Sequence, residues 1–181
     1  MEKTLKGKKI AMVVAFQDFR DEELFIPRSI FLNEGAEVKI VSEKKGEAVG
    51  SYGGTILVDL ELNELKGANF NAVVFVGGSG AAAYIENEEC WRIARETVEQ
   101  GRILGAICIA PAILARSGVL EGKKATVWSS RIDKSAVKIL ENSGALYENK
   151  PVVIDDRIIT ANGPTAARKF GEEIVRALMD N

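Results

Sequence analysis

The sequence predicts an α/β fold in which helices cover both faces of a mostly parallel β-sheet. Strand-like apolar runs alternate with helix-like segments from one end of the chain to the other, the pattern of repeated strand–helix units. No low-complexity tract or composition break marks a linker, and 181 residues lie within the single-domain range. We therefore expect one domain over residues 1–181.

The first third of the chain predicts two strands, one helix and one hairpin. Residues 9–16 (K-I-A-M-V-V-A-F) are almost continuously apolar, which is typical of a strand buried on both faces. Residues 21–33 predict a helix with acidic residues in its first turn, and residues 37–42 predict the next strand. Residues 47–59 indicate an extended excursion, with a hairpin turn around Gly53 and Gly54.

The middle third predicts two further strand–helix units. Residues 72–76 (A-V-V-F-V) form a buried strand, and an amphipathic helix over residues 88–100 stops at Gly101. Residues 103–107 predict a strand that turns directly into a helix over residues 110–117.

The last third predicts shorter elements. Strands are expected at residues 125–128, 152–154 and 158–160, and helices at residues 134–142 and 165–179.

Charge and hydropathy exclude several classes of partner. The net charge is −2 and the basic residues are scattered, so no basic surface for nucleic acid or for an anionic membrane is expected. The longest apolar runs are too short or too interrupted to span a bilayer. Residues 1–6 are polar and lead into a strand, unlike a signal peptide, so we expect a cytoplasmic protein.

The chain has no histidine and only two cysteines. The missing histidine excludes a Ser-His-Asp triad, a Cys-His dyad and the zinc-protease helix motif. Cys90 and Cys108 lie far apart, which argues against a disulfide framework or a zinc cluster, so neither a metal nor an organic cofactor is expected.

A site is expected beyond the carboxyl ends of the parallel strands, where ligands bind in open α/β sheets. Four loops occupy those positions, and they hold most of the thiol, small and titratable residues near strand ends: residues 17–23, 77–80, 108–111 and 129–131.

Cys108 is the candidate nucleophile because it lies where an apolar strand ends and a helix begins. A helix N-terminus favours a thiolate, and Pro111 suits the first helical turn. The alternative is a buried packing cysteine. Cys90, in the middle of a predicted helix, is expected to be a packing residue.

Glu23 is the candidate acid. The cluster Asp21-Glu22-Glu23 also fits simple charge placement at a helix N-terminus. Glu23, however, shares a helical face with Pro27 and Ile30, so it can point inward to the strand ends. A desolvated carboxyl there would stay protonated and donate a hydrogen bond to the Cys108 thiolate.

The glycine loop after residues 72–76 has three interpretations. Residues 78–83 match G-x-G-x-x-A, a dinucleotide-binding pattern, but they lie in mid-chain rather than in the first strand–helix unit. The loop can also form an oxyanion hole with the N–H of Ile109 beside Cys108. A plain turn that needs positive φ is the third interpretation.

Four motifs together resemble the ThiJ/PfpI superfamily, the DJ-one/PfpI family, over nearly the whole chain. They are a nucleophile elbow (A-I-C-I-A-P, residues 106–111), an acid before a proline (E-L-F-I-P, residues 23–27), the loop V-G-G (residues 76–78) and T-A-N-G-P (residues 160–164). The resemblance implies a flavodoxin-like three-layer sandwich, akin to class I glutamine amidotransferases, and a homo-oligomer, either a dimer or a hexamer.

The resemblance also implies a reactive cysteine held by a protonated glutamate, here Cys108 and Glu23. The remaining expected site residues are backbone donors at Gly77, Gly78 and Ile109, and pocket residues Trp128, Asn162, Gly163 and Pro164.

The chain departs from the peptidase-like members, which place a histidine directly after the cysteine and an acid after the glycine loop. Here Ile109 follows the cysteine, no acid follows the glycine loop, and Trp128 takes a position that is often histidine or tyrosine. Without a histidine, an amine leaving group has no obvious proton donor.

The resemblance implies a stress-protective enzyme that acts on small reactive carbonyls or their protein adducts, glyoxalase- or deglycase-like, and Cys108 is the residue whose thiolate would act. One alternative is a non-catalytic sensor of oxidative stress through Cys108 oxidation. The other is an intracellular cysteine peptidase, which the missing histidine disfavours.

Overall fold

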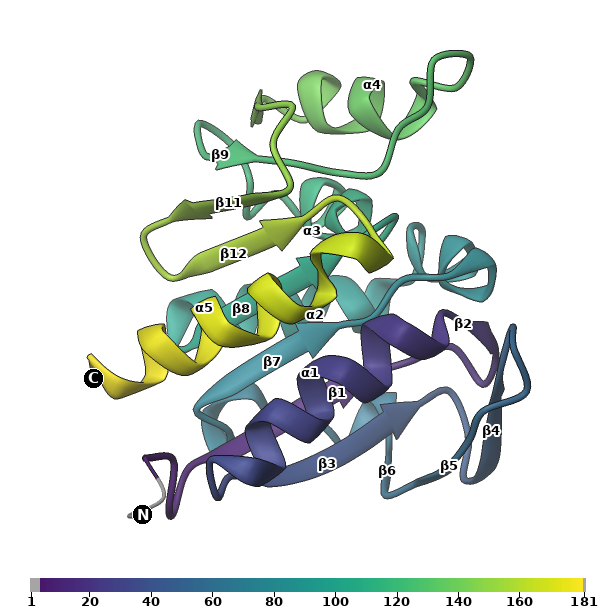
Figure 1. Cartoon of the computed structure of the whole chain (residues 1–181). Coiled ribbons are helices and arrows are strands. Elements are labelled where there is room, and N and C mark those ends of the chain that lie inside the picture. The colour runs from purple at the N-terminus through teal and green to yellow at the C-terminus, as the bar shows by residue number, and fades with distance from the viewer. Residues whose placement is uncertain (1–3, 181) are drawn as a thin grey trace.

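A computed structural model describes residues 4–180, and a seven-stranded sheet forms its centre (Figure 1). The strand order is β11-β12-β8-β7-β1-β3-β6, and all neighbours are parallel except β11 and β12. The strands are β1 (Lys9–Val13), β3 (Glu37–Ser42), β6 (Leu60–Glu61), β7 (Ala72–Phe75), β8 (Ile103–Ile107), β11 (Val152–Asp155) and β12 (Ile158–Ala161). The predicted mostly parallel α/β sheet is confirmed.

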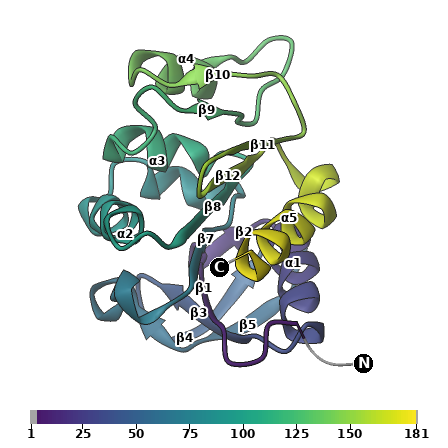
Figure 2. The same cartoon turned by 90° about the vertical axis from the view of Figure 1, so that its left-hand side faces the viewer.

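Helices cover both faces of this sheet (Figure 2). Helices α1 (Asp21–Asn33) and α5 (Ala167–Met179) pack together on one face, and α2 (Glu88–Glu99) packs with α3 (Pro111–Ser117) on the other. The remaining α-helix, α4 (Ser135–Asn142), packs against α3. Because side chains alternate along a strand, Ile10 and Met12 of β1 join one apolar core and Ala11 and Val13 join the other.

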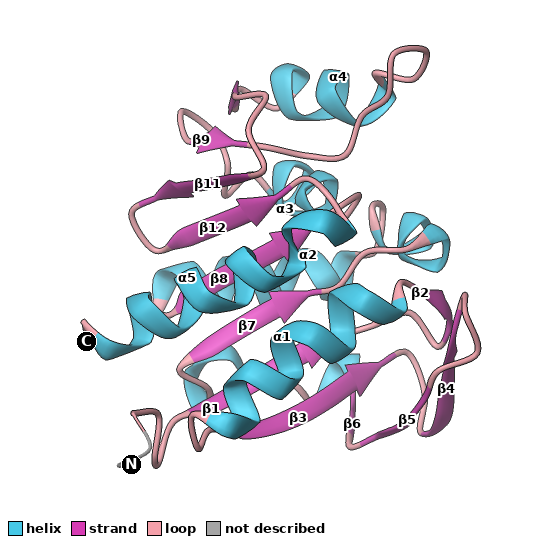
Figure 3. Ribbon diagram, in the orientation of Figure 1, coloured by secondary structure: helices cyan, strands magenta, loops and turns pink. Residues whose placement is uncertain are grey.

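The predicted hairpin is confirmed and belongs to a separate small sheet (Figure 3). Strands β4 (Gly46–Gly50) and β5 (Thr55–Val58) pair antiparallel around Gly53 and Gly54. β1 ends at Val13 rather than at Phe16, and a short strand that follows it, β2 (Gln17–Phe19), pairs with β4. The chain that leaves β1 therefore meets the hairpin before α1 begins.

The prediction of a strand over residues 125–128 is wrong, because these residues add no strand to the central sheet. Only β9 (Lys124–Ala125) forms, and it pairs with β10 (Leu146–Tyr147) outside the central sheet. The N–H of Thr126 donates to Thr160 Oγ1 (3.0 Å) and the N–H of Trp128 donates to the carbonyl of Cys108 (2.8 Å). Ladder pairing is replaced by bonds that lead the chain toward Cys108.

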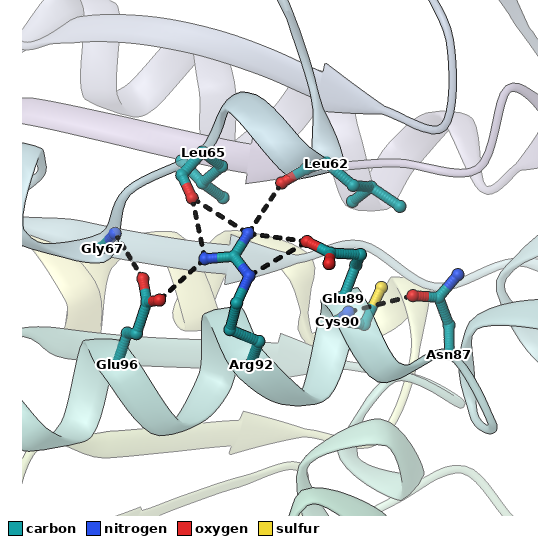
Figure 4. Close-up of polar contacts among 8 residues, drawn as sticks. All are labelled: Leu62, Leu65, Gly67, Asn87, Glu89, Cys90, Arg92 and Glu96. Carbon is teal, nitrogen blue, oxygen red and sulfur yellow. Dashed lines mark hydrogen bonds and ion pairs between the residues drawn. The ribbon is translucent and has the colours of Figure 1, made fainter.

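Helix α2 is joined to the loops before β7 by Arg92 (Figure 4). The Arg92 guanidinium donates to the carbonyls of Leu62 and Leu65 and pairs with Glu89 and Glu96. Those loops contain the 3₁₀ turns η1 (Leu62–Glu64) and η2 (Gly67–Asn69).

Cys90 lies in the first turn of α2, not in its middle, and its N–H donates to the Asn87 side chain (3.0 Å). It is fully buried in the apolar core, which supports its expected packing role.

Two more 3₁₀ turns lie near the strand ends: η3 (Ser79–Tyr84) follows β7, and η4 (Pro164–Ala166) precedes α5. The expected helix at residues 165–179 therefore begins at Ala167, after a tighter turn. No helix within residues 4–180 is long and apolar enough to cross a membrane. The polar segment of residues 1–6 lies partly outside the described residues.

Candidate active site

A cavity of about 460 Å³ opens beyond the carboxyl ends of β7 and β8. Cys108, Glu23 and the glycine loop after β7 line this cavity, as expected from the rule that ligands bind beyond the carboxyl ends of parallel strands. Its lining residues are Arg20, Glu23, Ser51, Gly78, Ser79, Ala82, Cys108, Ile109, Trp128 and Pro164. A second cavity of about 300 Å³, near the start of β8 and the end of α5, contains neither cysteine.

Cys108 occupies a sharp turn between β8 and α3. Its φ is +64°, a left-handed conformation that non-glycine residues rarely adopt. The turn is held on both sides, because the Cys108 N–H donates to the carbonyl of Ala161 (2.9 Å) and its carbonyl accepts from Trp128 N–H (2.8 Å). The half-buried thiol is thereby fixed at the cavity wall.

Two backbone N–H groups, those of Gly78 and Ile109, hydrogen-bond to the Cys108 sulfur. Gly78 has a φ of +108°, and a Cβ at this position would lie 2.4 Å from the backbone nitrogen of Arg20. Only glycine therefore allows the loop to come this close. The arrangement fits the oxyanion-hole interpretation of the loop better than a plain turn.

Gly77 has a different role from the one expected. Its N–H donates to Oε2 of Glu23 (3.0 Å), so it holds the acid and is not among the residues that line the cavity. A Cβ at Gly77 would lie 2.4 Å from that oxygen and 2.6 Å from Cβ of Cys108. The glycine thus permits the acid and the thiol to meet.

Glu23 lies in the first turn of α1 and is fully buried, with its carboxyl hydrogen-bonded to the Cys108 thiol. Its Oε1 is buried and has no hydrogen-bond partner among the described residues. Burial raises the pKa of Glu23 to about 7, against the lowering effects of Cys108 and the Gly77 N–H. A proton on this carboxyl would remove the cost of an unpaired buried charge.

The expected lowering of the Cys108 pKa by the helix N-terminus is not the dominant effect. Burial and the neighbouring Glu23 raise the pKa of Cys108 to about 12, while the N–H groups of Gly78 and Ile109 lower it. The raising effect of Glu23 requires an ionised carboxylate. The two groups therefore titrate as a coupled pair that retains one proton over a wide pH range.

The structure brings some of the predicted pocket residues together and not others. Trp128 and Pro164 line the cavity, but Asn162 and Gly163 do not. The N–H of Asn162 donates to the carbonyl of Pro151 (3.0 Å), and a Cβ at buried Gly163 would lie 3.9 Å from Cδ1 of Trp128. Gly163 therefore lies beside Trp128 without lining the cavity.

Four cavity residues were not singled out from sequence: Arg20, Ser51, Ser79 and Ala82. Arg20 and Ser79 belong to two of the loops expected beyond the carboxyl ends of the strands, so their place along the chain could have indicated them. Ser51 had none, because it reaches the cavity from the tip of the β4–β5 hairpin.

The other two acids of the cluster hold neighbouring groups in place. Asp21 accepts from the N–H groups of Tyr52 (2.9 Å) and Gly54 (2.8 Å), which ties the hairpin to α1. Glu22 pairs with the Arg20 guanidinium (2.8 Å). Within residues 4–180, no group of three or more histidine, cysteine or acidic side chains could hold a metal ion.

Comparison with known proteins gives a consistent set of relatives. Residues 8–177 match the model of the DJ-1/PfpI family. An uncharacterized protein of Methanocaldococcus jannaschii is 40% identical over 98% of this chain and 85% of its own length. A protein of Thermococcus kodakarensis named a deglycase is 31% identical over 92% of this chain and 98% of its own.

A solved structure of a ThiJ/PfpI domain protein from Brachyspira murdochii has a TM-score of 0.92 and 30% identity. It covers 97% of this chain and 99% of that one, so the whole described architecture is shared.

Proposed function

The chain belongs to the DJ-1/PfpI family, and on that premise we propose that it is a cysteine-dependent, stress-protective enzyme. Its substrates are small reactive carbonyl compounds or their adducts on proteins, so the activity is glyoxalase- or deglycase-like. The deglycase name of the T. kodakarensis relative supports this substrate class. Neither a metal nor an organic cofactor takes part in the proposed chemistry.

One observation carries the proposal: the Cys108 sulfur, the N–H groups of Gly78 and Ile109, and the Glu23 carboxyl converge at one cavity wall. In the reactive form, the single proton of the pair lies on Glu23 and the sulfur is a thiolate. The thiolate adds to the carbonyl carbon, so a C–S bond forms and the carbonyl π bond breaks. The two N–H groups stabilise the developing oxyanion, and Glu23 donates its proton to that oxygen.

The rest of the reaction needs only water. For a 2-oxoaldehyde, the ionised Glu23 takes the proton from the former aldehyde carbon and returns it to the neighbouring carbon, while the hydroxyl proton on the first carbon's oxygen moves to the oxygen of the second. The product is a thioester of a 2-hydroxy acid, and water hydrolyses it to release the acid and the thiol. The aldehyde carbon is oxidised and its neighbour is reduced, so no external oxidant is consumed.

The same geometry supports a second candidate, a sensor of oxidative stress. A sulfinate on Cys108 would accept hydrogen bonds from Gly78, Ile109 and protonated Glu23, which are the groups around the sulfur now. The peptidase alternative remains disfavoured, because Ile109 follows the cysteine and the chain has no histidine.

The test is the conversion of glyoxal to glycolate, measured by chromatography. The enzyme is present at a small fraction of the aldehyde concentration, so that repeated turnover can be seen. We expect many turnovers per protein molecule for the wild type, and a loss of at least about 100-fold for Cys108→Ser and for Glu23→Ala, as removal of a nucleophile or general acid predicts. Cys90→Ala, the matched control, should retain the activity because Cys90 is buried in the core.

The outcomes separate the two candidates. Glycolate formation that depends on Cys108 but not on Cys90 supports the enzyme. If glyoxal is consumed only in proportion to the protein, while peroxide converts Cys108 to a sulfinate, the enzyme proposal is overturned in favour of the sensor.

A further inference from the structure

We propose that Arg20 makes this site selective for carbonyl compounds that carry a carboxylate next to the reactive carbonyl. This inference rests on the proposed function, because it names the substrate class of the same cavity. It concerns a residue outside the cysteine–glutamate pair and outside the motifs that carry the family resemblance.

The backbone of Arg20 is fixed beside one of the two N–H donors. Its N–H donates to the carbonyl of Gly77 (3.0 Å), and Gly78 packs so closely that a Cβ there would lie 2.4 Å from the Arg20 nitrogen. The side chain starts from the residue before α1 and lines the cavity together with Cys108. A substrate carbonyl held at Cys108 therefore lies in a cavity that Arg20 also lines.

The guanidinium is oriented by two contacts. Glu22 accepts from Nε (2.8 Å) and Nη2 (3.2 Å), and the guanidinium carbon lies 4.7 Å from the centre of the Tyr52 ring. Among the described residues, Nη1 has no hydrogen-bond partner, and the side chain is 31% exposed. One edge of the guanidinium is thus available to an oxyanion, and Arg is well suited to bind carboxylates.

Arg20 supplies the positive charge that an anionic substrate needs in this cavity. Arg20 is the one basic side chain among the described residues that line it, and the other charged groups are Glu23 and Cys108. Once the pair has lost a proton, its negative charge repels an anionic substrate. Arg20 offsets that repulsion, and the hydroxyls of Ser51 and Ser79, which have no hydrogen-bond partner within residues 4–180, add neutral donors.

The experiment compares alkylation of Cys108 by iodoacetate, which is anionic, and by iodoacetamide, which is neutral. In both reactions the sulfur forms a C–S bond and iodide leaves, so only the charge of the reagent differs. The rates are followed by mass spectrometry of the peptide that contains Cys108. The measured quantity is the ratio of the iodoacetate rate to the iodoacetamide rate at low salt.

We expect Arg20→Gln to lower this ratio about 5-fold or more, as the loss of one nearby charge in a partly exposed site predicts. Glu22→Gln should raise it, because it frees the guanidinium, and a misfolded variant would not give an increase. Arg131→Gln is the matched control, since Arg131 is exposed and does not line the cavity. Its ratio should equal that of the wild type.

Equal ratios in the wild type and the Arg20→Gln variant, with Cys108 still reactive, would overturn this inference and leave the proposed function intact. A Cys108 that reacts with neither reagent up to pH 9 would instead overturn the proposed function, and with it this inference.

Discussion

At the scale of single residues, the site is governed by one proton shared between two acids. Burial disfavours the anion of each group, and the Glu23 carboxylate further raises the pKa of the Cys108 thiol. The pair therefore loses its first proton near neutral pH and keeps its second to strongly alkaline pH. Between these limits, the thiolate exists whenever the remaining proton lies on Glu23.

This coupling predicts a pH profile with a plateau for alkylation of Cys108 by iodoacetamide. The rate should rise near pH 7, where the pair ionises, and then stay level to about pH 10, because the second ionisation lies at the upper pKa of about 12. In Glu23→Gln the carboxylate charge is gone, so one step should remain, below the upper step of the wild type. The measurement is the rate of modification of the Cys108 peptide from pH 5 to 10.

Cys90 provides an internal control in the same digest, because burial raises its pKa to about 12 and it should stay unmodified. A single step at the same pH in both proteins would show that Glu23 does not share a proton with the thiol.

The sequence was sufficient to select the acid and the thiol but not the direction of the thiol pKa. Helical spacing placed Glu23 on the inward face, and the strand-to-helix turn placed Cys108 at a strand end. The direction of the Cys108 pKa shift depends on how deeply the thiol and the carboxyl are buried together. Their shared burial depends on Gly77, whose missing side chain lets them meet and whose N–H donates to Glu23.

At the scale of elements, the β4–β5 hairpin acts as a wall of the site. It carries Ser51 to the cavity and Tyr52 to the Arg20 guanidinium. The Asp21 carboxylate holds the hairpin tip. A Cβ at Gly50 or at Gly54 would lie 2.5 Å from that carboxylate, so glycine at both positions leaves room for it. Asp21 of α1 therefore helps to set the position of the wall, together with the pairing of β2 with β4.

Asp21→Ala should therefore loosen the hairpin tip. Two N–H groups lose their acceptor, and we expect a loss of about 1–2 kcal/mol in the free energy of unfolding, as for one or two hydrogen bonds. KM for the carbonyl substrate should rise more than kcat falls, because Cys108 and Glu23 are untouched. Hydrogen exchange at residues 50–54 and steady-state kinetics measure the two effects.

Glu47→Gln, an exposed change on the same hairpin, is the matched control and should alter neither quantity. Faster exchange at the tip with unchanged KM would show that the hairpin is not a wall of the substrate site.

Most elements were predictable because their signals are local. Residues 103–107 form the expected strand because they are continuously apolar and buried, residues 37–42 form the expected strand with its second half buried, and residues 21–33 form the expected helix. The prediction for residues 125–128 was wrong for a physical reason: buried Thr126 and Val127 resemble a strand, but the N–H groups of Thr126 and Trp128 donate to the Thr160 side chain and to the carbonyl of Cys108. Such long-range contacts leave no periodic pattern.

At the scale of the whole molecule, the fold keeps a buried carboxyl, Glu23, whose ionisation lowers stability. Glu23 has a raised pKa, so the native state binds its proton more tightly than the unfolded chain does. Between the unfolded pKa, near 4.5, and the folded value of about 7, the native state holds a proton that the unfolded state has released. Stability must therefore fall as the pH rises through this window.

The last prediction follows from that sign. Glu23→Gln removes the titration while its side-chain oxygen can still accept from the Gly77 N–H, so it should equal the wild type within about 1 kcal/mol at pH 4.5, the net worth of one hydrogen bond. At pH 7.5 it should be more stable by roughly 3 kcal/mol, the linkage value for a shift of this size. Urea unfolding at the two pH values measures the difference. Glu172→Gln, an exposed change on α5, should show no such dependence on pH. A stability gain for Glu23→Gln that is the same at both pH values would mean that repacking, not the buried charge, is its cause.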